Sequence, residues 1–164
     1  MVKKILFIAL SFFVFWGCAA APQKNIVNVK LDKLSNDYIS SDITTLLKNI
    51  YAPARTNIVI NVKYNKKFNE SLQSALRSVG YSVREIKHKE ATIYPNELQI
   101  EYVIDKIKES SEEKRIRKIN NDNSIIVRVS IIIDKKMYSR MYKLYKTYEM
   151  TAISRWLESD IISF

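Results

Sequence analysis

The stretch TNIVINVKYNKKFNESLQSALRSVGYSVREI, residues 56–86, contains the clearest structural signal in the chain. Its first part, residues 56–64, alternates apolar and polar side chains, as a half-buried strand does. Residues 67–79 then repeat apolar side chains at three- and four-residue intervals, which predicts a helix. Gly80 follows where a helix end favours a residue without a Cβ atom, and residues 81–86 predict another strand. The stretch is therefore expected to form a strand–helix–strand unit.

A further helix is expected before this unit. Apolar side chains recur at helical spacing between residues 36 and 50, and Ser35 or Asn36 is expected to cap the start of the helix. Pro53 ends the pattern, because proline disfavours helical geometry in the residue before it.

Antiparallel strands are expected after the unit. Residues 98–105 alternate apolar and polar side chains, and residues 124–133 are strongly β-prone. The sequence Asp134–Lys136 can turn this second strand into residues 137–150. Residues 106–118 hold nine charges and are expected to form a solvated turn or a strand extension. Together these features predict an α+β fold, with one strand–helix–strand unit and an antiparallel set of strands.

The composition points away from catalysis. The 164 residues fit one domain and include two glycines, one cysteine and one histidine. A single histidine and a single cysteine exclude a zinc site built from a cluster of these residues. Two isolated glycines exclude a glycine-rich phosphate loop. We therefore expect no enzymatic activity, no bound metal and no cofactor.

The N-terminus has the pattern of a bacterial lipoprotein signal. Two lysines precede an apolar stretch at residues 5–16, and Gly17 and Cys18 follow it. A thiol at this position can carry a diacylglycerol through a thioether, and acyl chains hold a protein on a bilayer. Residues 1–17 are expected to be a cleaved signal peptide, with lipid attached to Cys18. An ordinary secretory signal and an uncleaved membrane anchor are the alternatives.

Three segments follow from this interpretation: a signal peptide at 1–17, a lipidated tether at 18–35 and a single periplasmic domain at 36–164. The formal net charge is +10, yet an exported protein meets no cytoplasmic nucleic acid. The expected anionic partners are therefore lipid or lipopolysaccharide headgroups and acidic patches on proteins. The alternative is that the charge only keeps the surface soluble.

Tyrosines and basic residues gather in the last third of the chain. Tyrosine and arginine are enriched where proteins bind one another, because they combine a large contact area with a polar group. On a strand, Tyr138, Arg140 and Tyr142 would share one face. The alternative is that these tyrosines fill the core. The candidate partner-binding residues are Arg128, Tyr138, Arg140, Tyr142, Lys143, Tyr145 and Lys146.

Several short motifs also occur in a fixed order along residues 18–156. They are Cys18, Tyr51-Ala-Pro53-Ala-Arg-Thr56, Phe68, Leu72, Leu76-Arg77, Gly80-Tyr81, Tyr102 with Asp105, Arg128-Val129, Ser139-Arg140-Met-Tyr142 and Trp156. This ordered set resembles the TrbH family of conjugal transfer lipoproteins, which are components of the mating-pair formation type of type IV secretion.

The resemblance implies envelope assembly and not catalysis. A TrbH-like lipoprotein would be anchored on the inner leaflet of the outer membrane through Cys18, with its domain in the periplasm. Its partners would be other subunits of the secretion channel, with a ring or homo-oligomer as one arrangement. The alternative function is that of an unrelated envelope lipoprotein. Such a protein would bind lipopolysaccharide, peptidoglycan or another envelope protein through a basic, Tyr-rich face.

Overall fold

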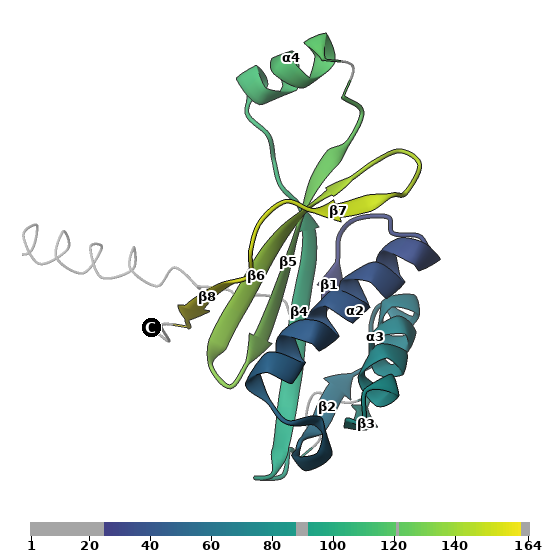
Figure 1. Cartoon of the computed structure of the whole chain (residues 1–164), viewed down its shortest axis with the longest axis vertical. Helices are drawn as coiled ribbons and strands as arrows, with labels where there is room; N and C mark the ends of the chain where they lie inside the picture. The colour runs from purple at the N-terminus through teal and green to yellow at the C-terminus, as the bar shows by residue number, and fades with distance from the viewer. Residues whose placement is uncertain (1–24, 88–91, 121, 162–164) are drawn as a thin grey trace, which may run out of the picture.

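The computed structural model describes residues 25–87, 92–120 and 122–161, so Cys18 and the expected signal peptide lie outside the described residues. An eight-stranded sheet carries two helices, α2 (Lys33–Ile50) and α3 (Lys66–Ser78), on one face (Figure 1). A further helix, α4 (Ser111–Ile119), stands apart at one end of the sheet. The fold is α+β, as the sequence predicts.

The sheet combines a small parallel part with a larger antiparallel part. Its strands are β1 (Ile26–Val27), β2 (Asn57–Asn61), β3 (Ser82–Ile86), β4 (Glu97–Lys106), β5 (Ile125–Ile133), β6 (Lys136–Leu144), β7 (Met150–Ala152) and β8 (Leu157–Asp160). They lie in the order β3-β2-β4-β5-β6-β7, with β1 also beside β4 and β8 also beside β6. The pairs β2–β3, β2–β4 and β1–β4 are parallel, and the other pairs are antiparallel.

The predicted strand–helix–strand unit is confirmed as β2-α3-β3. The helix buries Phe68, Leu72 and Leu76 against the sheet, which is the apolar stripe seen in the sequence. Gly80 has a φ of +97°, a backbone conformation that residues with a Cβ atom rarely adopt. The neighbouring Tyr81 hydroxyl donates a hydrogen bond to the Tyr51 carbonyl at 2.8 Å, which ties the end of α2 to the start of β3.

The predicted antiparallel strands are confirmed as well, but the last one, expected over residues 137–150, ends at Leu144, and a turn separates it from β7. β5 and β6 form a hairpin in which Ile133 pairs with Lys136. Asp134 and Lys135 make the turn with φ values of 47° and 64°. Two residues with positive φ give a turn whose twist matches that of the flanking strands. β7 and β8 then pair with the outer edge of β6 and complete the sheet.

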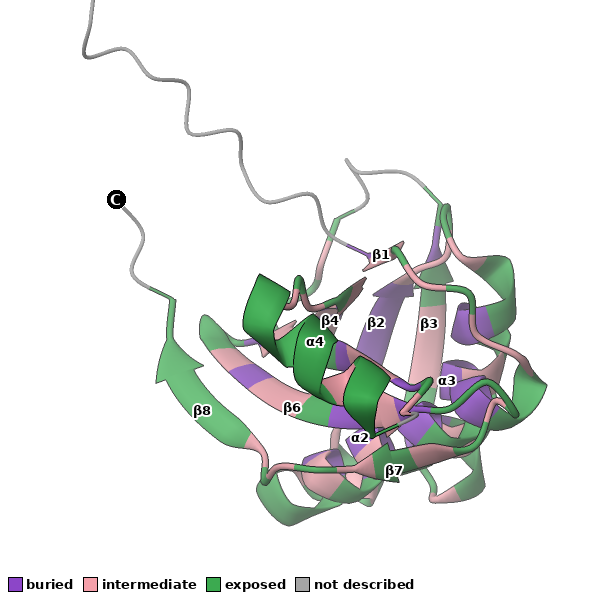
Figure 2. Ribbon diagram, turned by 90° about the horizontal axis from the view of Figure 1, so that it is seen from above, coloured by how far each residue is buried: buried purple, intermediate pink, exposed green. Residues whose placement is uncertain are grey.

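The core lies between the helices and the sheet (Figure 2). Its buried aliphatic and aromatic side chains come from one side of α2 and of α3 and from alternate positions of the strands. They are Ile39, Ile43, Leu47, Ile58, Ile60, Phe68, Leu72, Leu76, Tyr81, Ile100, Tyr102, Ile104, Val127, Val129, Ile131, Ile133, Tyr138, Tyr142 and Leu144. Burial of each such large apolar side chain contributes roughly 1.5–3 kcal/mol.

The folded domain begins earlier in the chain than the sequence predicts. α2 starts at Lys33 and is capped by Asp32, whose carboxylate accepts a hydrogen bond from the Ser35 N–H at 2.8 Å. Ile26 pairs with Val103 of β4, and Asn25 is buried. Residues 25–35, assigned to the tether from the sequence, therefore belong to the domain. Val27, Val29 and Leu31 pack against the core, so the apolar side chains of this stretch, spaced among polar ones, could have revealed that it is part of the domain.

α4 corrects the interpretation of residues 106–118 as a solvated turn or strand extension. Ser110 caps the helix: its hydroxyl accepts from the Glu113 N–H at 3.2 Å, and the Glu113 carboxylate accepts from the Ser110 N–H at 2.7 Å. This reciprocal pair is a capping box. The Ser-x-x-Glu spacing is visible in the sequence and could have revealed the helix, but the high charge density concealed it.

Candidate functional site

The structure places the predicted partner-binding residues in two different environments. Tyr138, Arg140 and Tyr142 do share one face of β6, as expected, but that face points toward α2. Tyr138 and Tyr142 are buried in the core. This part of the expected docking face is therefore covered by α2 in the folded chain. Alternation along a strand shows which side chains lie together, but not which face of the sheet is covered.

Arg140 and Tyr142 meet Asp42 of α2 in a polar cluster at the edge of the core. Arg140 Nη1 donates to both carboxylate oxygens of Asp42, at 2.6 and 2.7 Å. The Tyr142 hydroxyl donates to the same carboxylate. Side-chain exposure is 23% for Arg140 and 19% for Asp42. A shielded pair of this kind interacts more strongly than an exposed one, because water screens it less.

The same arginine also holds the C-terminal segment on the sheet. Arg140 Nε donates to the Ser154 carbonyl at 2.9 Å, and the Ser154 hydroxyl accepts from the Met141 N–H at 2.9 Å. The guanidinium lies 5.8 Å from the ring centre of Tyr142 and 5.9 Å from that of Trp156. The motif residues Arg140, Tyr142 and Trp156 thus form one cluster that joins a helix, a strand and the segment between β7 and β8.

The remaining predicted partner-binding residues lie outside this cluster. Arg128 projects from the opposite face of the sheet and pairs with Asp105, with Nη2–Oδ2 at 2.7 Å. Lys143 pairs with Asp122 at 2.7 Å, and its hydrogen bond holds the pKa of that carboxyl well below the usual value. Tyr145 and Lys146 are exposed in the turn after β6.

A second polar cluster surrounds Tyr102, in the middle of β4. The Tyr102 hydroxyl donates to the Asn69 side chain at 2.9 Å, and the ring packs edge-on against Phe68. The Tyr102 N–H donates to the Asn25 side chain at 3.1 Å, and Asn65 donates to the Asn25 carbonyl. The asparagines carried no recognisable signal in the sequence, because amides at turns and helix starts are common anywhere on a surface.

These buried phenols predict a loss of stability at alkaline pH. Burial raises the pKa of Tyr102 from an ordinary value of 10 to about 12, and burial together with the hydrogen bond to Asp42 raises that of Tyr142. The native state therefore holds both protons more tightly than the unfolded state does. The stability that they contribute is complete below pH 10 and falls as the pH rises from 10 through 12.

Denaturant unfolding of the chain at about pH 9 and about pH 11 measures this effect. We expect a lower free energy of unfolding at the higher pH and a smaller alkaline loss in the Tyr102→Phe variant. An equal alkaline loss in that variant would contradict the assignment to Tyr102.

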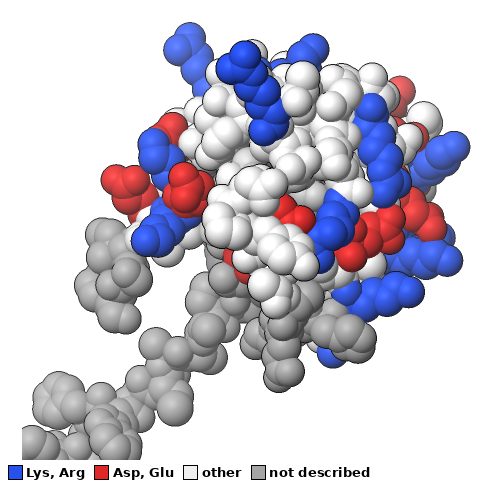
Figure 3. All heavy atoms as spheres, turned by 90° about the horizontal axis from the view of Figure 1, so that it is seen from below, with Lys and Arg blue, Asp and Glu red and all other residues white. Residues whose placement is uncertain are grey.

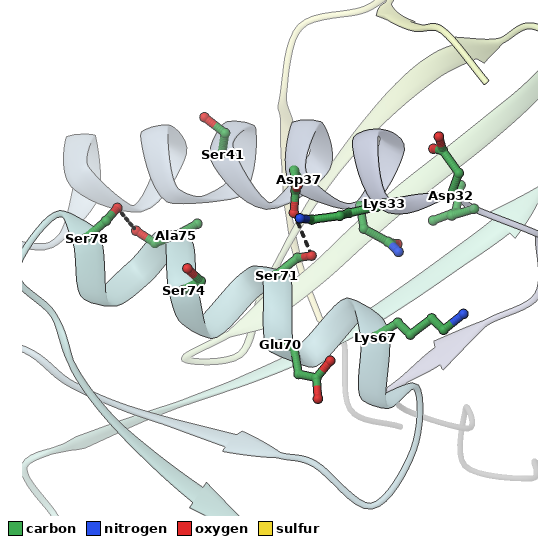
Figure 4. A pocket seen from close by; sticks show the side chains of 12 residues that line it. Asp32, Lys33, Asp37, Ser41, Lys67, Glu70, Ser71, Ser74, Ala75 and Ser78 are labelled. Carbon is green, nitrogen blue, oxygen red and sulfur yellow. Dashed lines mark hydrogen bonds between the residues drawn. The ribbon is translucent and has the colours of Figure 1, made fainter. Parts of the chain in front are cut away.

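One open groove lies between the two packed helices (Figure 4). Its volume is about 740 Å³, and Asp37 of α2 and Ser71, Ser74 and Ser78 of α3 help to line it. Ser71 donates to Asp37 at 2.7 Å, so these groups satisfy one another across the groove. Within the described ranges, no three His, Cys, Asp or Glu side chains come together as metal ligands. In the described part of the chain, no helix combines the length and the apolar composition that a membrane span requires.

On the face seen from below, basic side chains lie at the top, and basic and acidic side chains lie next to one another at the left and right of a largely neutral area (Figure 3). Elsewhere in the described chain, Arg128, Arg140 and Lys143 each have an acidic partner.

The fold and the two polar clusters define the class of protein: a two-layer α+β domain whose shared polar groups fasten helices and chain ends to a central sheet. The chain belongs to the TrbH family, since the family described as conjugal transfer protein TrbH matches residues 20–160. This confirms the resemblance seen in the sequence motifs, and the family implies a function in conjugal transfer. No curated protein and no solved structure matches the chain.

Proposed function

We propose that the chain is a lipid-anchored structural subunit of a conjugative type IV secretion apparatus, without enzymatic activity of its own. Cys18 carries the lipid, the outer membrane holds the acyl chains, and the domain faces the periplasm. The observation that carries the proposal is the family match, which covers the whole described domain and begins two residues after Cys18. The same match favours this function over that of an unrelated envelope lipoprotein.

The motif residues support a role as an assembly subunit. Phe68, Tyr102, Arg140 and Tyr142 are held by packing or by hydrogen bonds within the domain. Other channel subunits would therefore bind to exposed parts of the domain. Arg128, Tyr145 and Lys146 are the exposed members of the predicted partner-binding set, and we retain them as proposed contacts with such subunits or with further copies in a ring.

Lipid attachment is tested with the Cys18→Ser variant. We expect the full-length chain, expressed in a bacterium with two membranes, to fractionate with the outer membrane. Its intact mass should match residues 18–164 plus acyl chains. The variant should lose the lipid mass and be released from the membrane fraction by a high-salt wash, because serine has no thiol to form the thioether.

Complementation separates the anchor from the rest of the proposal. In a donor strain that lacks the gene, the wild-type chain should restore plasmid transfer and the Cys18→Ser variant should not. An unlipidated wild-type chain would refute the anchor. Full transfer in the deletion strain without the chain would refute the conjugative role.

A further inference from the structure

Of the described helices, α4 is the one that does not pack into the core of the domain. It stands beyond the ends of β4 and β5, and it has no extensive packing contact with another described helix or strand (Figure 1). None of its nine residues is buried (Figure 2). An isolated helix of this length is marginal in water, because tertiary packing supplies most helical stability. A surface that receives α4 would supply the missing stabilisation.

The charges of α4 are separated along its length. The carboxylates of Glu112 and Glu113 lie in the first turn, where Glu112 pairs with Arg115 and Glu113 completes the capping box. The second half, residues 114–119, reads KRIRKI and contains four basic residues, two isoleucines and no acid. Arg115 pairs with Glu112, and Arg117 pairs with Glu109 at 2.7 Å. Among the described residues this leaves Lys114 and Lys118 as the basic residues of α4 without an ion pair, and they are the ones free to meet lipid phosphates.

The two isoleucines form the apolar part of this second half. Ile116 and Ile119 are three residues apart and so lie on the same side of the helix. Their exposed fractions are 47% and 71%, and the more exposed one is at the C-terminal end. Basic residues beside exposed apolar side chains are typical of segments that lie on anionic membrane surfaces.

The position of α4 allows it to reach the membrane to which the chain is proposed to be anchored. Residues 18–24, between Cys18 and the buried Asn25, span at most about 24 Å when fully extended. β1 joins the sheet at Val103, and the residues from there to Ser111 span at most about 28 Å. α4 follows the C-terminal end of β4, whereas the tether leaves beside the middle of this strand, since β1 and β4 are parallel. A tether that turns back along the sheet is therefore long enough to bring α4 to the same membrane.

We propose that residues 114–119 of α4 dock on the anionic phospholipid surface of the membrane that holds the acyl chains. Ile116 and Ile119 enter the headgroup region, and the basic side chains around them lie near lipid phosphates. This inference rests on the proposed anchor at Cys18, which keeps α4 close to the bilayer and so raises its effective concentration there. Docking by the arm fixes the orientation of the domain on the membrane, which a flexible tether alone does not.

Vesicle binding without acyl chains tests α4 separately from the anchor. The chain from residue 18 to 164 with Cys18→Ser contains the whole described fold, and its sedimentation with phosphatidylglycerol-containing vesicles and with pure phosphatidylcholine vesicles is compared. We expect binding to the anionic vesicles that weakens with added salt. Each lysine near such a surface contributes roughly a fivefold factor, so the Lys114→Gln/Lys118→Gln variant should bind roughly 25-fold more weakly.

Matched substitutions control for unspecific adhesion. Ile116→Ser/Ile119→Ser should abolish most of the binding, whereas Leu34→Ser on α2 should not, although Leu34 is as exposed as Ile119. Lys48→Ala, at the far end of α2, is the control for charge. Equal binding of all variants, or equal binding to both kinds of vesicle, would overturn the proposal.

A second measurement uses the acylated full chain. Cys18 is the one cysteine of the sequence, so a cysteine introduced by Ile119→Cys can be labelled alone with an environment-sensitive fluorophore. In anionic proteoliposomes we expect a shift to shorter emission wavelength and quenching by spin-labelled lipid, with neither change in the Leu34→Cys chain. A probe at residue 119 that responds only when other envelope proteins are added would assign α4 to a protein partner and refute membrane docking. The result leaves the conjugative role intact, since that role is tested by complementation.

Discussion

Replacing Asp42 by alanine is expected to lower the free energy of unfolding by about 3 kcal/mol. The substitution leaves the Arg140 guanidinium shielded from water without its carboxylate, and it removes the acceptor of the Tyr142 hydroxyl. Breaking a buried ion pair by removing one partner typically costs about 3–5 kcal/mol. The lower end applies because each side chain keeps about a fifth of its exposure. Urea unfolding followed by circular dichroism measures the change.

The ion pair between Arg128 and Asp105 is the matched control. It joins neighbouring strands with comparable geometry, Nε–Oδ1 at 3.1 Å and Nη2–Oδ2 at 2.7 Å, but half of the Arg128 side chain is exposed. Exposed pairs contribute about 0–1 kcal/mol. Arg128→Ala should therefore change stability little. Similar losses in the Asp42 and Arg128 variants would show that the cluster at the core edge is not a special source of stability.

Replacing Phe68 by alanine is expected to cost more, about 4 kcal/mol. The ring is 2% exposed and packs edge-on against Tyr102, with 4.8 Å between ring centres. Removing a buried phenylalanine side chain loses its transfer free energy and leaves a cavity, which together cost about 3–5 kcal/mol. The Asn69–Tyr102 hydrogen bond next to it should loosen as well. Urea unfolding should show a lower midpoint with an unchanged slope.

Phe68→Leu separates volume from the aromatic contact. A leucine refills most of the space, so the expected loss is about 1 kcal/mol. Nearly equal losses for the leucine and alanine variants would mean that the ring contact, and not the filled volume, accounts for the effect.

Periodicity predicted the parts of the fold in which apolar side chains decide the structure. The stretch 56–86 shows alternation, then a helical stripe, then Gly80 and a second strand. In each part only one kind of element, strand or helix, puts the apolar side chains on one face where they can be buried. The hairpin around Asp134 and Lys135 follows for the same reason, since two β-prone runs flank a two-residue polar turn. In these segments the local preference for strand or helix and the burial of apolar side chains favour the same structure.

Polar contacts between distant segments were not predictable in this way. Asp42 carried no signal, because a carboxylate in a helix is normally solvated, and its partner Arg140 lies 98 residues away. The sequence showed Tyr138 and Tyr142 on one face but not α2 above that face. For the same reason these two tyrosines, expected to bind a partner, became part of the core, while Arg128 on the other face stayed exposed.

The early start of the domain has a mechanical consequence. A chain held by lipid at Cys18 transmits any pull on the domain through Asn25, whose side chain and carbonyl are bonded to Tyr102 and Asn65. Tension therefore enters near the centre of the sheet, at β4, where several strands share it, and not at a fraying end. For the proposed anchored subunit, a load from the membrane would therefore meet the hydrogen-bonded strands of the sheet before the helices.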